Sequence, residues 1–113
     1  MTTQDDIWTA EEQLWTGTAD MMKDRIAPTC LMAFPGEGLL QSAAIAAAIE
    51  DSVRWENVLM KGRFKAETDG TIVLGYTATG YRDGRPPYHA LCTSTWRQTA
   101  QGWQMIQHQQ TPI

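Results

Sequence analysis

His108 is the first residue to consider for chemistry, because an imidazole titrates near neutral pH and its neighbours within the segment 107–110 are uncharged amides. His108 could therefore act as a general acid or base. The alternative is a histidine that only hydrogen-bonds within its strand. The second histidine, His89, is distant in sequence, and two histidines so far apart are poor evidence for a metal site, so the sequence predicts none.

Two tyrosines are candidates for a ligand pocket. Tyr76 and Tyr88 each combine an apolar ring with one directional hydroxyl, which suits the wall of a binding site. The alternative role is core packing, with the hydroxyl reaching water. We expect Tyr88 or His108 to supply a polar contact to a ligand.

Large apolar side chains are numerous, with five tryptophans and six methionines in 113 residues. Methionine adapts its shape and indoles form rigid walls, so these residues could line a cavity for a flat apolar ligand. They could equally form the core that any domain of this size needs. The predicted cavity walls are Trp15, Met22, Met32, Phe34, Met60, Tyr76 and Trp96, with Trp55 as a further candidate.

Known catalytic signatures are missing from the sequence. The chain contains no Ser-His-Asp order, Gly-x-Ser-x-Gly, phosphate-binding loop or dinucleotide fingerprint, which removes the common hydrolase, ATPase and dehydrogenase functions. The sequence therefore predicts no cofactor and leaves the catalytic residues unknown.

Length and charge narrow the class of protein further. A chain of 113 residues has room for one domain, which we place over 1–113. The net charge of −4 is spread along the chain, so we expect no nucleic-acid partner. No apolar run approaches the ~20 residues that span a bilayer, and the acidic start lacks a signal peptide's pattern. We therefore expect no membrane partner, a cytoplasmic location and free thiols at Cys30 and Cys92.

Helical periodicity covers two segments. Apolar residues recur at helical spacing from 5 to 26, which predicts one long amphipathic helix despite Gly17 inside it. A short apolar run over 29–34, stopped by Pro35 and Gly36, predicts a buried strand. The alanine-rich segment 41–52 predicts a second helix that packs closely against another element.

Beyond residue 52 the apolar period becomes two, which predicts four strands separated by turns at Asp69-Gly70, at Asp83-Gly84 and near Gly102. The first of these strands should have one apolar face, formed by Val58, Met60, Gly62, Phe64 and Ala66. In the last two strands both faces carry bulky apolar groups, including Leu91, Trp96, Trp103 and Ile106. Helices can cover one face, so we expect a second copy of the chain to cover the other, giving a homodimer through the outer face of the sheet.

The order helix, short strand, Pro-Gly, helix and four-strand meander ending in GWQMIQHQQTP resembles the nuclear transport factor 2-like superfamily, which includes relatives of ketosteroid isomerase and of polyketide cyclases. The resemblance implies an α+β, cone-shaped barrel, with N-terminal helices packed in a strongly bent antiparallel sheet and a pocket between them. It also implies frequent dimerisation. This fold hosts isomerases, dehydratases, cyclases and plain binding domains.

Catalytic residues do not carry over from this resemblance. Ketosteroid isomerases use an aspartate before a proline on the first strand, and the matching residue here is Phe34, before Pro35. Phenylalanine cannot transfer a proton. The first helix also lacks the tyrosine that those enzymes use to stabilise an oxyanion. Three hypotheses remain: a small-molecule-binding domain with an apolar pocket, a cofactor-independent isomerase, cyclase or dehydratase, and a protein assembly module.

Overall fold

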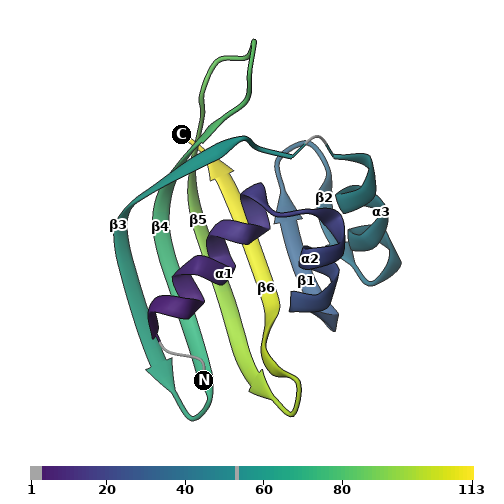
Figure 1. Cartoon of the computed structure of the whole chain (residues 1–113), viewed down its shortest axis with the longest axis vertical. Coiled ribbons are helices and arrows are strands. Elements are labelled where there is room, and N and C mark those ends of the chain that lie inside the picture. Colours follow the sequence, from purple (N-terminus) through teal and green to yellow (C-terminus); the bar gives the residue numbers. More distant parts are fainter. Residues whose placement is uncertain (1–3, 53) are drawn as a thin grey trace.

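The computed structural model describes residues 4–52 and 54–113, which form three helices and six strands. The strands form a single curled sheet in the order β2-β1-β6-β5-β4-β3, and the sheet does not close into a barrel. Helix α1 lies across the concave face, while α2 and α3 cover the β1–β2 end (Figure 1). The predicted α+β class is therefore confirmed.

The N-terminal helical segment is two helices, so the prediction of one continuous helix was wrong. Helix α1 is Gln4–Thr16 and helix α2 is Ala19–Arg25. A Cβ at Gly17 would lie 2.6 Å from the carbonyl oxygen of Gln13, and the side chain of Thr18 accepts a hydrogen bond from the Met21 amide. Gly17 thus allows a tight end to α1 and Thr18 caps the start of α2.

Two strands form one end of the sheet, and helix α3 follows them in the chain. Strand β1, Ile26–Phe34, begins three residues earlier than predicted, directly after α2. Strand β2, Gly38–Gln41, was not predicted; it pairs antiparallel with β1. Helix α3, Ala43–Asp51, follows and buries Ile45 and Ile49.

A bulge changes the faces of the next strand. Strand β3, Asn57–Thr68, pairs with β4, Thr71–Tyr81, but the register shifts between Lys61 and Phe64 near Gly62, whose φ is 58°. Two residues of β3 therefore lie opposite one residue of β4, and beyond this bulge the β3 side chains point to the opposite faces of the sheet from those expected. Val58 and Met60 are buried as predicted, whereas Phe64 lies opposite Gly75 and is 76% exposed. The prediction of one apolar face along the whole strand was wrong beyond the bulge.

The last two strands also differ from the prediction. In β5, Tyr88–Thr99, and β6, Gly102–Pro112, the buried side chains face the helices, and Trp103 packs against the same core. Their outer face is mostly polar and joined by hydrogen bonds between threonines and glutamines, such as Thr93 to Gln109 and Thr95 to Gln107. Among the described residues of these two strands, Leu91 is the one large apolar side chain that is exposed.

Two apolar clusters fill the concave side of the sheet. One joins the helices to β1 and to parts of β4, β5 and β6 around Trp96 and Met105, and the other surrounds Trp15 near β3 and β4. Cys30 and Cys92 are buried free thiols, as predicted, and burial raises the pKa of each to about 12. Within the part of the chain that is described, none of the helices is long and apolar enough to cross a bilayer.

Candidate functional site

A cavity of about 320 Å³ lies beside the C-terminal end of α1, between α2, α3, β1 and the ends of β4 and β5. Its volume is at the lower end of the ~300–1,000 Å³ typical of ligand pockets. Most of its wall is apolar. The lining residues are Leu14, Trp15, Met22, Met32, Phe34, Pro35, Glu37, Leu40, Ile45, Ala48, Ile49, Ser52, Arg54, Trp55, Arg82, Tyr88 and Gln110.

Aromatic rings form one wall of the cavity. Trp55 stacks on Tyr88, with ring centroids 5.4 Å apart and an interplanar angle of 15°, and Trp15 contacts both rings. The guanidinium carbon of Arg82 lies 3.7 Å from the centroid of Trp55, on which it stacks. Gly80 permits this arrangement, because a Cβ there would lie 2.9 Å from the Trp55 ring. The aromatic wall therefore ends at the Arg82 guanidinium, which lies over the indole of Trp55.

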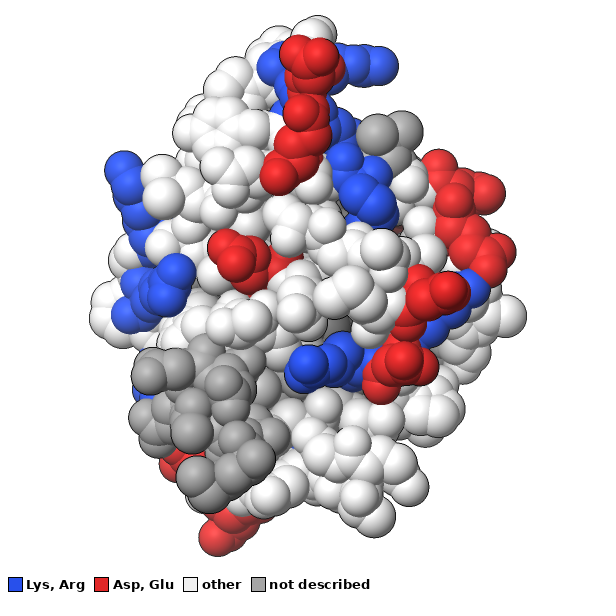
Figure 2. Space-filling view, viewed as in Figure 1, with Lys and Arg blue, Asp and Glu red and all other residues white. Residues whose placement is uncertain are grey.

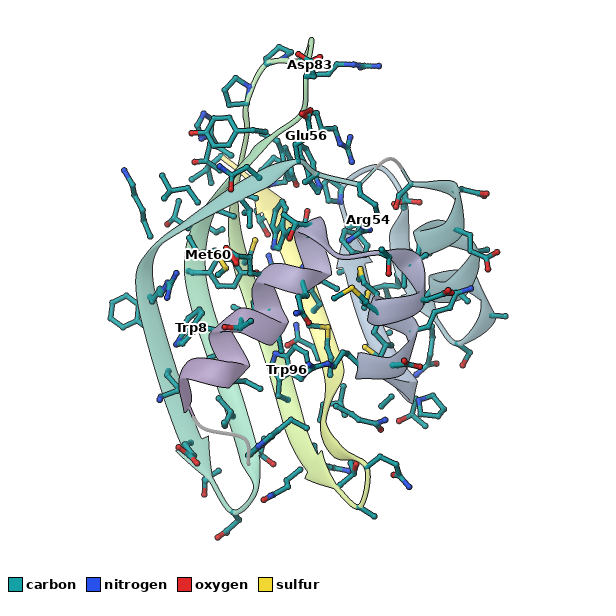
Figure 3. The ribbon with its side chains drawn as sticks, viewed as in Figure 1. Trp8, Arg54, Glu56, Met60, Asp83 and Trp96 are labelled. Carbon is teal, nitrogen blue, oxygen red and sulfur yellow. The ribbon has the colours of Figure 1, made fainter. Side chains whose placement is uncertain are left out.

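Arg54 brings a second guanidinium to the cavity. Its Nε donates to the carbonyl oxygen of Gly17 at 2.9 Å, and its Nη2 contacts the carbonyl oxygens of Leu14 and Trp15. These carbonyls belong to the C-terminal end of α1, which carries partial negative charge. Burial and, to a lesser extent, the charge of Arg82 lower the pKa of Arg54. Figure 3 shows Arg54 between the end of α1 and α3.

Two further polar groups line the cavity. The hydroxyl oxygen of Tyr88 is buried and makes no hydrogen bond to any described residue. Burial raises the pKa of Tyr88, so its hydroxyl remains protonated and available as a donor at neutral pH. Gln110 also lines the cavity, and its amide nitrogen lies 3.1 Å from Nε2 of His108.

Behind the cavity lies a buried carboxylate, Glu11, whose side chain is fully inaccessible. Its Oε2 accepts hydrogen bonds from the Tyr76 hydroxyl at 2.5 Å and the Ser94 hydroxyl at 2.6 Å. Its Oε1 accepts one from Nε1 of Trp96 at 2.9 Å. Three donors thus converge on one acceptor, which is how a buried charge is made tolerable.

The directions of these bonds determine the tautomer of His108. The Ser94 hydroxyl has one proton, which goes to Glu11, so Ser94 must accept from Nδ1 of His108 across the 2.6 Å contact. Nε2 then accepts from the amide of Gln110. Burial lowers the pKa of His108, opposed in part by the nearby Glu11 carboxylate, and the imidazole is therefore neutral at neutral pH.

This buried network does not resemble a nucleophilic triad. Ser94 is fully buried and its hydroxyl already donates to Glu11, so it has no access to a substrate carbonyl. Both oxygens of Glu11 are occupied by protein donors. The network reaches the cavity through Gln110 and through Trp15, whose Nε1 donates to the Tyr76 hydroxyl at 3.1 Å.

Five of the nine predicted ligand-binding residues come together in the cavity, together with the further candidate Trp55: Trp15, Met22, Met32, Phe34 and Tyr88. The other four are not among its lining residues. Tyr76, Trp96 and His108 are bound into the Glu11 network instead, although the His108 ring lies 5.7 Å from that of Phe34. Met60 lies on the β3–β4 side of α1, away from α2 and α3 (Figure 3). We find no group of metal-ligating side chains among the residues described.

Sequence reasoning missed Glu11, Arg54 and Arg82. Glu11 had a visible signal, because it lies four residues after Ile7 and four before Trp15, on the buried stripe of α1. Arg54 and Arg82 gave no such signal in the sequence, because both lie outside the helices and strands.

Comparison with known proteins agrees with this architecture. No family model and no curated protein sequence matches the chain. Among solved structures, it is similar to a protein from Parabacteroides distasonis ATCC 8503 provisionally assigned as a ketosteroid isomerase, with a TM-score of 0.85, 14% identity, and coverage of 99% of this chain and 89% of that one. It is also similar to a nuclear transport factor 2-like protein from Cytophaga hutchinsonii ATCC 33406, with a TM-score of 0.83, 16% identity, and full coverage of both chains.

A third similar structure is a CaMKII hub homology domain from Chlamydomonas reinhardtii, with a TM-score of 0.75, 13% identity, and coverage of 99% of both chains. The fold and cavity define an α+β domain in which a curled sheet encloses its N-terminal helix. The chain has the nuclear transport factor 2-like fold, as its sequence predicted.

Proposed function

We propose that this protein binds a small, largely apolar molecule in the cavity beside α1. The observation that carries the proposal is the convergence of seven helices and strands on one open space with rigid aromatic walls and a few polar groups. A domain that needed only a core would fill this space with side chains. Phe34 lines the cavity, and the sequence resemblance matches it to the proton-transferring aspartate of ketosteroid isomerases, which favours binding over catalysis.

Two alanines on α3 allow a matched test. Ala48 lines the cavity, whereas Ala47 is exposed on the same helix. Ala48→Met should fill part of the cavity without loss of helix propensity, and Ala47→Met adds the same atoms at an exposed position. A thermal-shift screen of flat apolar carboxylates, amides and ketones should find compounds that stabilise wild type and Ala47→Met but not Ala48→Met.

The result that would overturn the proposal is equally specific. If no compound stabilises the wild-type protein, or if hits stabilise Ala48→Met as strongly as Ala47→Met, the cavity is not a binding site.

We also propose that the protein is a homodimer through the outer face of the sheet. Large apolar side chains are exposed on that face, although they come from several strands rather than from β5 and β6 alone: Leu31, Leu59, Phe64, Val73 and Leu91. Light scattering should give twice the chain mass for wild type and for Met21→Arg on α2, and a single chain mass for Leu91→Arg. A wild-type monomer at micromolar concentration would refute this.

Two buried free thiols support a cytoplasmic location, because reducing compartments keep thiols free. Fractionation of the source cells would test it. Recovery of the chain outside the cytoplasmic fraction would refute this location.

A further inference from the structure

Arg54, Arg82 and Tyr88 are neighbouring donors in the cavity wall. Arg54 and Arg82 also line one adjacent depression, and Arg82 and Tyr88 both pack on the Trp55 ring. Other lining residues are apolar, among them Met32, Leu40 and Ile45. Cationic donors beside apolar walls suit a molecule with an anionic group and an apolar part.

Among the described residues, the hydrogen-bond partners of Arg54 leave one of its N–H groups over. Its Nε donates to Gly17, and the two protons of Nη2 are shared among the carbonyl oxygens of Leu14 and Trp15 and the sulfur of Met22. Nη1 has two protons and donates one, to the Ser52 hydroxyl at 3.3 Å. Every acceptor in this set is neutral, and no described carboxylate lies within ion-pair distance of Arg54. Its charge is offset only by the carbonyl dipoles of α1.

The Tyr88 hydroxyl is a second donor in the same position. It is buried, protonated at neutral pH and without a hydrogen-bond partner in residues 4–52 and 54–113. A buried hydroxyl without a partner destabilises a folded domain by about 1–3 kcal/mol, so such groups are rare unless a water, an ion or a ligand satisfies them. An acceptor in the cavity would satisfy both Tyr88 and Arg54.

Two acidic side chains, Glu56 and Glu37, lie near this end of the molecule. Glu56 accepts a hydrogen bond from the backbone amide of Asp83, across the mouth of a neighbouring depression that Arg54, Arg82 and Arg85 also line. Glu37 lines the cavity but is exposed. Positive and negative groups adjoin at this end of the surface (Figure 2), and Glu56 and Asp83 lie at the base and tip of the projecting β4–β5 loop (Figure 3).

We infer that the ligand of this cavity is a monocarboxylate with a short apolar tail, held by Arg54, Arg82 and the Tyr88 hydroxyl at its carboxylate and by the methionine- and isoleucine-lined wall at its tail. This inference rests on the proposed binding function and names the class of ligand. An ionised carboxylate is the group that fits, because it only accepts hydrogen bonds and its charge is opposite to that of the two guanidinium groups. The small volume limits the tail to a short chain or a single ring.

The test uses a pair of probes that differ only in charge, 4-phenylbutyrate and its primary amide 4-phenylbutanamide. Isothermal titration should show the acid binding wild type at least about tenfold more tightly than the amide. Arg82→Gln should reduce this preference to less than about threefold. Arg85→Gln is the matched control, because Arg85 is exposed outside the cavity and its loss changes the net charge equally.

Tyr88→Phe gives a readout that a merely structural role would not produce. Since its hydroxyl has no partner in the described protein, the variant should be as stable as wild type or more stable without ligand, yet bind 4-phenylbutyrate several-fold more weakly. A variant that is less stable and binds the acid normally would contradict the assignment of this hydroxyl.

The outcomes separate the inference from the function beneath it. Equal affinity for acid and amide would overturn the carboxylate inference and leave an apolar binding site. A preference for the acid that survives in Arg82→Gln, or that falls equally in Arg85→Gln, would also overturn it. If neither probe binds and the screen against Ala48→Met finds nothing, the binding function itself fails and the inference with it.

Discussion

Replacing Glu11 by glutamine should destabilise this protein strongly while leaving its shape intact. The carboxylate accepts three hydrogen bonds, from Tyr76, Ser94 and Trp96, and glutamine has one oxygen in place of two. The indole N–H of Trp96 can only donate. If the amide oxygen turns towards Trp96, the amide nitrogen meets two hydroxyls that both donate to Glu11 in the wild-type protein.

The size of the effect follows from these contacts. Hydrogen bonds to a charged acceptor contribute about 1.5–3 kcal/mol, against about 0.5–1.5 kcal/mol for neutral pairs, so three of them weaken by about 3–4 kcal/mol in total. One donor left without a partner costs about 1–3 kcal/mol more. Removal of the buried charge returns several kcal/mol of desolvation. We expect a net loss of about 2–4 kcal/mol, from the total of about 5–15 kcal/mol that is typical of a domain.

Urea denaturation followed by tryptophan fluorescence measures this loss. Glu12→Gln is the matched control, because Glu12 is the adjacent residue in sequence and is exposed; it should stay within about 0.5 kcal/mol of wild type. Tyr76→Phe should cost about 1–3 kcal/mol by itself and combine less than additively with Glu11→Gln, since both remove the same bond. If Glu11→Gln unfolds at the same urea concentration as Glu12→Gln, Glu11 does not organise the core as the contacts indicate.

Three further predictions follow from other contacts. Because burial lowers the pKa of His108 in the folded protein, the unfolded chain binds the proton more readily, so the free energy of unfolding should fall as the pH drops through about 6.5. His89→Gln should keep this dependence of stability on pH, and His108→Asn should lose it. The same pH dependence in both variants would contradict the burial of a neutral His108. Gly17→Ala should destabilise by about 1–3 kcal/mol, measured by urea denaturation, because its Cβ would lie 2.6 Å from the Gln13 carbonyl oxygen, and a gain in stability would show that α1 can extend. Gly80→Ala should displace Trp55 from the cavity wall and weaken binding of any hit from the thermal-shift screen; unchanged affinity would show that the position of Trp55 is unimportant.

Much of the fold could be predicted from the sequence because its signals are local. Apolar spacing of 3.6 and 2 residues, with Asp69-Gly70 and Asp83-Gly84 as turns, gave the helix, strand and meander order that the structure confirms. Where the prediction failed, the cause was a contact with another part of the chain or a weak local signal. The bulge near Gly62 reverses a face through its register with β4, and β2 is only four residues long.

The sequence by itself indicated that an apolar cavity could exist and named five of the residues that line it. The reason is that many large apolar side chains in so short a chain must lie in its interior. Only the tertiary structure decided which polar groups face that cavity. Tyr76 and His108 looked like ligand contacts, but Tyr76 is held by Glu11 and His108 by Ser94, whereas Arg54 and Arg82 line the cavity without any periodic signal. The physical reason is that the role of a polar side chain depends on the hydrogen-bond partners that folding brings near it. Glu11 is 65 residues from Tyr76 in the sequence, and Ser94 is 14 residues from His108.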